Sequence, residues 1–286
     1  MNFSMTETYS KTGYLPSKDR TSLFFRHYAV NQKKATVLLI HGFGEHSGRY
    51  SHVIDNLTQE RFEVWCIDFR GHGRSQGARG DIKDFRQYEE DVLAAIDHVL
   101  NNQNAQRKLF LLAHSMGALV SLHLMAKSRP PISGMVLSCP LLALKIPVPT
   151  WKKWASFCVA RIIPHIKISS GIKGAQLSSD QQFANGYESD PLILKNLSIR
   201  AFREIFNGYQ EAQSFAPIIT SSLFMQLGGD DPVVDIAASE RWFKQIDHHK
   251  VDASLKVYPG FLHEIYNEQK RQEAIDDFIL WLNERV

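Results

Sequence analysis

The chain has 286 residues, a length that suits one large α/β domain or two small ones. Hydrophobic residues make up 44% of the sequence and charged residues 22%, which is typical of a globular protein and argues against disorder. The formal net charge of +3 is too small to indicate a nucleic-acid partner.

The sequence predicts a cytoplasmic protein. Residues 1–10 show neither the basic region nor the apolar run of a signal peptide. No run reaches the roughly eighteen apolar residues of a membrane span. The cysteines, Cys66, Cys139 and Cys158, are widely spaced and odd in number, which is typical of reduced thiols in a cytoplasm.

Strands and helices are predicted to alternate along the first half of the chain. An antiparallel pair at 7–14 and 22–28 is followed by a buried strand at 35–40, a helix over about 47–60 and a strand at 62–69. Apolar spacings of three and four predict a helix over 85–101, and strands follow at 109–112 and 132–139. The pattern predicts an α/β fold with right-handed βαβ units, a mostly parallel central sheet and helices on both faces.

This alternation stops at Pro140. From 141 to 217 no run has the pattern of a buried strand, and helical segments are separated by proline and glycine. Strand and helix then alternate again, with strands at 222–227 and 255–258, a helix over about 235–246 and a last helix ending near Asn283. We therefore predict one α/β core domain made of 1–140 and 218–286, with 141–217 inserted as a helical cap.

A serine lies at the turn between the apolar strand at 109–112 and the helix after it. The turn reads Ala113-His114-Ser115-Met116-Gly117, which is the G-x-S-x-G pattern of a nucleophile elbow with alanine at its first glycine. Such a turn lifts the serine hydroxyl above the carboxyl edge of the sheet. The alternative is a buried serine in an ordinary strand–helix junction, so the role of Ser115 depends on the rest of the chain.

The chain also supplies a candidate base and a candidate acid. A serine nucleophile needs a histidine to take its proton and a carboxylate to orient that histidine. Asp230 and Asp231 follow the strand at 222–227, and His263 follows the strand at 255–258, which gives the known order serine, acid, histidine. Pro232 favours extended geometry at Asp231, so Asp231 is the preferred acid and Asp230 stays an alternative.

The remaining requirement of such a site is an oxyanion hole. The backbone N–H groups of Met116 and Phe43 are the candidates, and glycines on both sides of Phe43 allow close approach of a negative charge. A dinucleotide-binding loop is rejected because Gly48 comes one residue late for G-x-G-x-x-G after Gly42 and Gly44.

Several motifs together resemble the monoacylglycerol lipase and lysophospholipase branch of the α/β-hydrolases. They are HGFGEHSGRY at 41–50, DFRGHGRS at 68–75, the elbow, YESDPL at 187–192, and Gly228-x-x-Asp231 with His263. The similarity extends from about residue 7 to 285, and the run at 41–50 is its most specific part. The departures are Ala113 and the stretch between Cys139 and Tyr187, which resembles the family little.

This resemblance implies a serine esterase acting on lipid monoesters through an acyl-enzyme, with no metal and no organic cofactor. It also implies that Glu45, Arg49, His114 and Tyr187 line the polar end of the acyl pocket, where a glycerol moiety sits. Monoacylglycerol and lysophospholipid are equal candidates as the lipid ester substrate. The alternatives are a short-chain carboxylesterase, a serine peptidase of the same fold, and a non-catalytic α/β-hydrolase scaffold used for binding.

The predicted cap contains a basic, amphipathic stretch. Residues 141–175 include Lys145, Lys167 and Lys173 among their basic residues and have no acidic one. Apolar residues from Trp151 to Ile163 recur at helical spacing. This helix either packs its apolar stripe on the core or lies on an anionic membrane surface, with contacts through Trp151, Trp154, Lys152 and Lys153.

Overall fold

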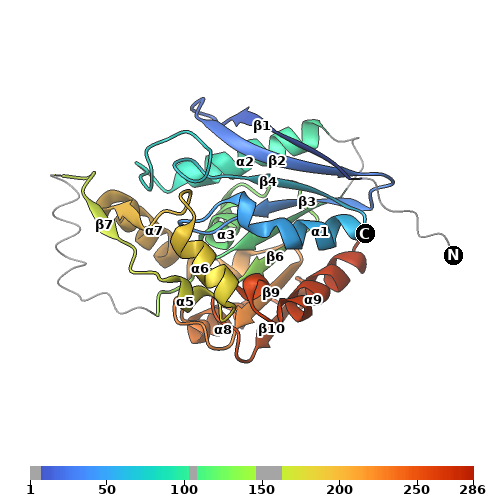
Figure 1. Cartoon of the computed structure of the whole chain (residues 1–286). Coiled ribbons are helices and arrows are strands. Elements are labelled where there is room, and N and C mark those ends of the chain that lie inside the picture. The colour runs from blue at the N-terminus through green and yellow to red at the C-terminus, as the bar shows by residue number, and fades with distance from the viewer. Residues whose placement is uncertain (1–7, 103–107, 146–162) are drawn as a thin grey trace.

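The computed structural model describes residues 8–102, 108–145 and 163–286. Its centre is an eight-stranded sheet with the strand order β1-β2-β4-β3-β5-β6-β9-β10 (Figure 1). The strands are β1 (Thr8–Pro16), β2 (Ser22–Val30), β3 (Ala35–Ile40), β4 (Phe62–Ile67), β5 (Leu109–His114), β6 (Gly134–Ser138), β9 (Leu223–Gly228) and β10 (Ala253–Tyr258). The β1–β2 and β2–β4 pairs are antiparallel, and the pairs from β4 to β10 are parallel. The predicted α/β fold with a mostly parallel sheet is confirmed.

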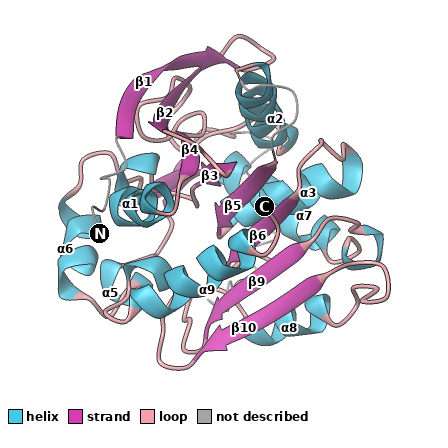
Figure 2. Cartoon of the chain, turned by 90° about the vertical axis from the view of Figure 1, so that its right-hand side faces the viewer, coloured by secondary structure: helices cyan, strands magenta, loops and turns pink. Residues whose placement is uncertain are grey.

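Helices cover both faces of this sheet. Figure 2 shows α1 (Ser51–Gln59) and α9 (Arg271–Asn283) on one face, with α2 (Arg86–Asn101), α3 (Met116–Lys127) and α8 (Ile236–Phe243) on the other. Every residue of β3, β4, β5, β6 and β9 is buried, as expected for strands that are covered twice. The hydrophobic core therefore has two layers, one between each face of the sheet and its helices, and the strands between them lead to the candidate site.

Most predicted elements are present, with changed ends. The helix expected over about 47–60 begins as a 3-10 turn, η1 (Ser47–Tyr50), before α1. The His46 side chain accepts a hydrogen bond from the Gly48 N–H and so caps this turn. The helix expected over about 235–246 is shorter, as α8, and β10 begins two residues before the predicted strand.

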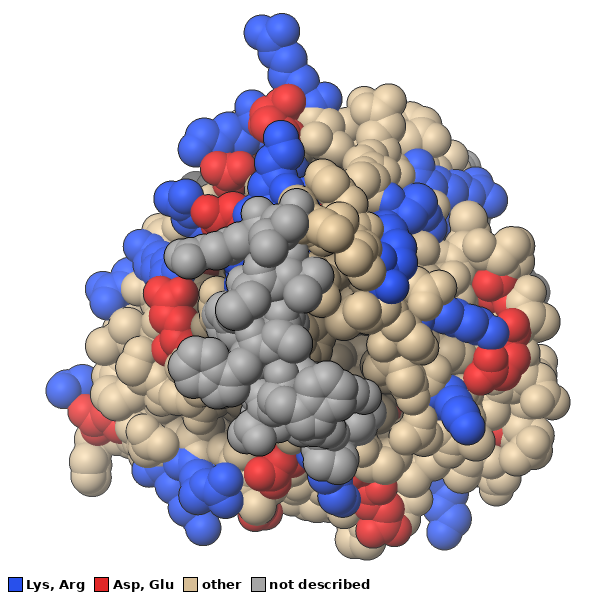
Figure 3. Space-filling view, turned by 90° about the vertical axis from the view of Figure 1, so that its left-hand side faces the viewer, with Lys and Arg blue, Asp and Glu red and all other residues tan. Residues whose placement is uncertain are grey.

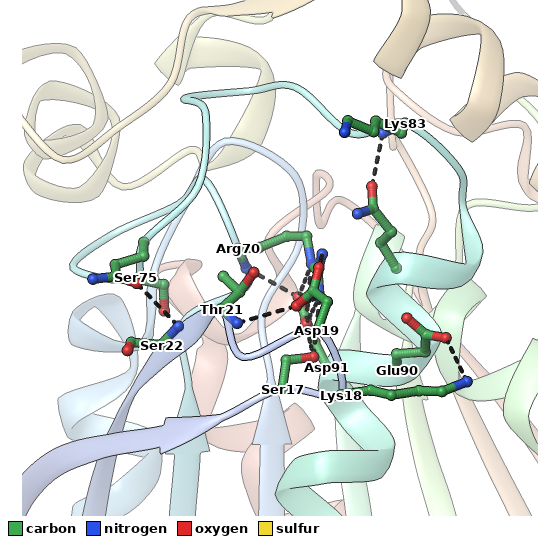
Figure 4. Close-up of polar contacts among 12 residues, drawn as sticks. Ser17, Lys18, Asp19, Thr21, Ser22, Arg70, Ser75, Lys83, Glu90 and Asp91 are labelled. Atoms are coloured by element: carbon green, nitrogen blue, oxygen red, sulfur yellow. Dashed lines mark hydrogen bonds and ion pairs between the residues drawn. The ribbon is translucent and has the colours of Figure 1, made fainter.

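A buried ion cluster fastens the β1–β2 turn to the rest of the core. The Arg70 guanidinium lies 2.6 Å from an Asp91 oxygen and 2.7 Å from Asp19, and the Ser17 hydroxyl donates to Asp91 at 2.7 Å (Figure 4). Asp91 is on α2, while Ser17 and Asp19 are in the turn. Because each buried charge has an oppositely charged partner, the cluster holds the turn against α2.

The described part of 141–217 contributes no strand to the central sheet. It contains β7 (Lys167–Ser169), α5 (Gly174–Leu177), α6 (Gln181–Ser189), β8 (Asn196–Ser198), α7 (Ile199–Ala212) and the 3-10 turn η2 (Ala216–Ile218). β7 and β8 form a two-stranded antiparallel sheet of their own. In Figure 1 this β7 lies with α5, α6 and α7 on the left of the molecule. Trp151, Lys152, Lys153 and Trp154 lie outside the described residues, as does Cys158.

Two further expectations concern the thiols and the membrane. Cys66 and Cys139 are free and buried. Within the described ranges, no helix has the length and apolar character needed to cross a bilayer.

Candidate active site

Ser115 occupies a strained turn between β5 and α3. Its φ of 50° and ψ of −112° lie in a region that non-glycine residues rarely adopt, and the turn is held by its N–H, which donates to the Ser138 carbonyl at 2.9 Å. Gly117 is needed on the helix side, because a Cβ there would lie 2.5 Å from the His41 carbonyl oxygen. On the strand side the methyl group of Ala113 is buried and accommodated. The residue that departs from the motif therefore fits the same turn.

Three side chains from distant loops meet at this turn. His263 Nε2 lies 2.9 Å from Ser115 Oγ, and His263 Nδ1 lies 2.6 Å from Asp231 Oδ2. The other Asp231 oxygen, Oδ1, accepts from the N–H groups of Val233 at 2.7 Å and Val234 at 3.0 Å. All three side chains are buried. The structure therefore brings the predicted serine, the predicted histidine and one of the two candidate aspartates into hydrogen-bonding contact.

The neighbouring aspartate is placed differently. Asp230 is exposed, and its backbone N–H donates to the Phe261 carbonyl at 2.9 Å. Of the two adjacent carboxylates, Asp231 is the one that contacts His263. Sequence reasoning preferred Asp231 and kept Asp230 as the alternative, and the burial of the two side chains separates them.

The charges of this hydrogen-bonded chain are coupled. Burial disfavours the charged imidazole of His263, but the charge of Asp231 and its hydrogen bond outweigh burial and raise the pKa of His263. Burial likewise opposes ionisation of Asp231, yet His263 and the Val233 and Val234 N–H groups lower the pKa of this carboxyl. The imidazole is therefore made a better proton acceptor by a carboxylate that stays ionised.

Cys139 is a third polar group beside this pair. Its Sγ lies with ligand atoms of Asp231 and His263 in a group whose members are all within 4.8 Å of one another. Burial first and the Asp231 charge second raise the pKa of the Cys139 thiol well above its ordinary value, so the thiol is neutral near pH 7. Its Sγ accepts from the Gly228 N–H at 3.3 Å. Within this group the Asp231 and His263 atoms are hydrogen-bonded to each other, and the neutral thiol lies beside them.

The loop after β3 runs along one side of the serine. A Cβ added at Gly42 would lie 3.1 Å from Ser115 Cβ and 3.1 Å from the His114 ring, so the backbone passes close to both residues. Phe43 follows and is half-buried. Met116 is the first residue of α3, where an N–H has no helical acceptor and where the helix favours negative charge. Of the two residues chosen from the sequence as oxyanion donors, Met116 therefore follows Ser115 directly, and Phe43 follows the glycine whose backbone passes close to Ser115.

A buried polar cluster lies at the end of the same loop. Glu45 Oε1 accepts from the Gly42 N–H at 2.6 Å and from the Tyr50 hydroxyl at 2.7 Å. Arg49 Nη2 lies 2.6 Å from Glu264, and its guanidinium lies 5.5 Å from the ring centroid of Tyr187. Burial first, and the nearby Glu264 charge second, raise the pKa of Glu45 to about 7. The structure thus brings Glu45, Arg49 and Tyr187 into one cluster.

Two atoms of this cluster have no hydrogen-bond partner. They are Glu45 Oε2 and Arg49 Nε, both buried and 3.7 Å apart. At this distance they form an ion pair but no hydrogen bond. Because buried polar atoms are normally hydrogen-bonded, this acceptor and donor mark a candidate place for the polar groups of a ligand.

His114 links this cluster to the base. Its ring centroid lies 4.8 Å from that of His263, and its Nδ1 lies 3.1 Å from Ser138 Oγ. Burial lowers the pKa of His114 well below its ordinary value, so the ring is neutral near pH 7. His41 is also neutral, since burial lowers its pKa to about 4, and its Nε2 accepts from the Phe69 N–H at 3.0 Å.

Sequence reasoning missed two functional candidates. Glu264 follows His263 directly and pairs with Arg49, and the Asn267 side chain also donates to it at 2.6 Å. Asp190 contacts His46 at 2.8 Å, although the two are far apart in the sequence. The only available signal was that His46 and Asp190 both lie inside motifs of the resemblance.

Comparison with known proteins places this geometry in a family. Residues 31–270 match the family described as Serine aminopeptidase, S33 (Hydrolase_4). Phospholipase YtpA of Bacillus subtilis is 30% identical over 86% of this chain and 94% of its own length. An uncharacterized abhydrolase domain-containing protein of Dictyostelium discoideum is 28% identical over 97% of this chain, which spans only 29% of that longer protein. The crystal structure of Paleococcus ferrophilus monoacylglycerol lipase superposes with a TM-score of 0.80 and 26% identity, covering 98% of this chain and 100% of that one.

Proposed function

Because the chain belongs to the Hydrolase_4 family of serine hydrolases, we propose that it is an esterase that cleaves the carboxylic esters of lipid monoesters. The substrate is a monoacylglycerol or a lysophospholipid. The observation that carries this proposal is the hydrogen-bonded series Asp231–His263–Ser115 at the end of a parallel sheet. The phospholipase and monoacylglycerol lipase among the similar proteins support the choice of a lipid ester.

In the proposed mechanism His263 acts first as a base and then as an acid. Its Nε2 takes the proton of Ser115 Oγ while Oγ bonds to the ester carbonyl carbon, and it then gives that proton to the leaving alkoxide. The ester C–O bond breaks, the alcohol leaves, and an acyl group stays on Ser115. Water activated by the same Nε2 then hydrolyses the acyl-enzyme and releases the fatty acid.

Charge stabilisation is assigned to two groups. Asp231 holds the proton on His263 Nδ1 and stabilises the imidazolium that forms in each step. The N–H groups of Phe43 and Met116 are proposed to donate to the oxyanion of the tetrahedral intermediate, which is worth about 3–4 kcal/mol per donor.

Glu45, Arg49, His114 and Tyr187 are proposed to receive the headgroup of the lipid. Glu45 Oε2 and Arg49 Nε, which make no hydrogen bond in the protein, offer one acceptor and one donor, which suits the hydroxyl groups of a glycerol. Residues 141–217 are proposed as a cap over the acyl chain.

The cap is also proposed to contact membranes through Trp151, Trp154, Lys152 and Lys153. One other basic residue of the cap, Lys145, is occupied within the protein, since it donates to the Asp231 carbonyl at 3.0 Å. The face in Figure 3 carries basic and acidic side chains in alternation. Replacement of Trp151 and Trp154 by Ala would then abolish co-sedimentation with anionic liposomes without changing the melting temperature, whereas a drop in melting temperature with unchanged binding would mean that these residues pack on the core.

Initial rates on a panel of esters test the proposed function. Monoglycerides and lysophospholipids of increasing acyl length should be hydrolysed with a higher kcat/KM than p-nitrophenyl butyrate. A preference for p-nitrophenyl butyrate would favour a short-chain carboxylesterase. Release of p-nitroaniline from aminoacyl anilides would favour a peptidase, which the description of the family makes the alternative.

A further inference from the structure

A series of hydrogen bonds joins the loop after β3 to the segment after α6. The His46 Nδ1 accepts from the Gly48 N–H at 3.1 Å, so the ring proton lies on Nε2. That Nε2–H donates to Asp190 Oδ2 at 2.8 Å, and Asp190 Oδ1 accepts from the Leu192 N–H at 2.8 Å. His46 is buried, with 7% of its side chain exposed, and Asp190 is partly buried at 28%. Each atom of this series has one defined role as donor or acceptor.

A backbone contact reinforces this connection next to the proposed oxyanion donor. The Leu194 N–H donates to the Gly44 carbonyl at 2.7 Å. Gly44 has a φ of +82°, and a Cβ there would lie 2.8 Å from the Leu194 carbonyl oxygen. The backbones of Gly44 and Leu194 are therefore in contact. Gly44 follows Phe43, whose N–H is the proposed donor to the oxyanion.

The base of this loop is held by the core, and at its tip Gly44 is hydrogen-bonded to Leu194, a residue of the segment after α6. The Ser47 N–H donates to Asp68 at 2.8 Å, which holds the base of the loop. The Gly42 N–H is bound by Glu45, a residue of the loop itself. The contacts of Asp190 and Leu194 are thus placed to set the position of the loop tip.

The other end of the α5–α6 unit holds the loop of the base. The Glu264 N–H donates to the Leu177 carbonyl at 2.8 Å, and the Ser178 hydroxyl donates to the Asn267 carbonyl at 2.7 Å. The Glu268 side chain accepts from the Ser179 N–H at 3.1 Å. One short unit of the proposed cap therefore contacts both the loop of the oxyanion donor and the loop that carries His263.

We propose that Asp190 is a positioning residue for the oxyanion hole, acting through His46 on the loop at 42–48. The inference rests on the proposed function, because it assigns a task to the Phe43 N–H in ester hydrolysis. It makes the α5–α6 unit part of the fixed frame of the active site. Asp190 touches neither the substrate nor the reacting atoms; it fixes where one donor points.

The test compares Asp190→Ala with Glu188→Ala in the full-length protein. Glu188 is a matched control because it is an exposed carboxylate two residues away that pairs with Lys195 and has no contact with the 42–48 loop in the described structure. We expect Asp190→Ala to lower kcat for p-nitrophenyl butyrate about 10- to 10²-fold, as for a reacting group displaced by about 1 Å, with KM within about twofold. Glu188→Ala should keep wild-type kinetics.

An oxyanion-forming inhibitor separates positioning from a general structural effect. A trifluoromethyl ketone adds to the serine and places an alkoxide in the oxyanion hole, so its Ki should rise by the same factor as kcat falls in Asp190→Ala. His46→Gln keeps an N–H donor for Asp190 and should retain kcat within about threefold, whereas His46→Ala should match Asp190→Ala. The double variant of His46→Ala and Asp190→Ala should be no worse than either single one, because both remove one contact.

The outcomes are distinct. Unchanged kcat in Asp190→Ala, an unchanged inhibitor Ki beside a lower kcat, or an equal loss in Glu188→Ala would overturn the inference. If Asp190→Ala does not fold, the comparison of His46→Gln with His46→Ala decides in its place, and equal rates in those two variants overturn it. A wild-type protein without esterase activity would overturn the proposed function instead.

Discussion

Replacing Asp231 by asparagine tests the acid of the site most sharply. In the protein, Asp231 Oδ1 accepts from two backbone N–H groups, and Oδ2 accepts from His263 Nδ1. An asparagine has only one acceptor oxygen, and the Val233 and Val234 N–H groups hold it in the Oδ1 place. Its NH₂ group then faces His263 Nδ1. The imidazole must move its proton to Nε2, where it points at Ser115 and can no longer accept the serine proton.

The size of the effect follows from this change of tautomer. We expect Asp231→Asn to lower kcat by about 10² to 10⁴ with little change in fold, because the shape of the side chain is kept. Asp230→Asn should leave kcat unchanged within about twofold, since that side chain is exposed and away from His263.

The same variant should shift the pH profile in a defined direction. The free base form of His263 is the active one, so the rate rises with pH through the pKa of His263, which Asp231 raises above its ordinary value. Loss of the Asp231 charge lowers that pKa, and the acid limb of kcat/KM should move to lower pH while its plateau falls. Rates on p-nitrophenyl butyrate across the acid and neutral range measure both. An acid limb that moves to higher pH, or a larger loss in Asp230→Asn, would refute the reasoning.

Three other expectations follow from the contacts. Gly117→Ala should destabilise the protein by about 1–3 kcal/mol in urea unfolding, because its Cβ would meet the His41 and Ile40 carbonyl oxygens, and an unchanged midpoint would contradict this. Asp91→Ala should cost about 3–5 kcal/mol in the same assay, since it removes the buried partner of Arg70, and a loss below about 1 kcal/mol would count against the cluster in Figure 4. Glu264→Gln should move the acid limb of the rate profile to lower pH, because the Glu264 charge helps to raise the pKa of His263, and no movement would show that the two groups are not coupled.

The sequence predicted those parts of the fold that depend on local pattern. The apolar runs that became β3, β4 and β5 read directly as strands because both faces of each strand are covered. The order of the strands in the sheet could not be predicted from such local patterns. β2 pairs with β4 rather than with β3, its neighbour in the chain, and this pairing depends on crossover connections that no local pattern encodes.

The site residues, too, could be predicted only where a local pattern in the sequence marks them. Ser115 and His263 could be singled out because the order of loops and the small residues around the elbow are properties of the sequence. Pro232 favoured Asp231 over Asp230 but did not exclude Asp230, since the features that separate them are burial and the two N–H donors from Val233 and Val234. The contact of His46 with Asp190 joins residues 144 positions apart and becomes visible only in three dimensions.

The most direct measurement is labelling of the protein with a fluorophosphonate, read by intact mass and by the modified peptide. The account predicts one phosphonyl group per chain, located on Ser115, and a loss of esterase activity in proportion to labelling. Ser115→Ala should bind no label and lower kcat by about 10³-fold or more while keeping the fold. Label on another residue, or turnover by Ser115→Ala within about tenfold of the wild type, would contradict the assignment of Ser115 as the nucleophile.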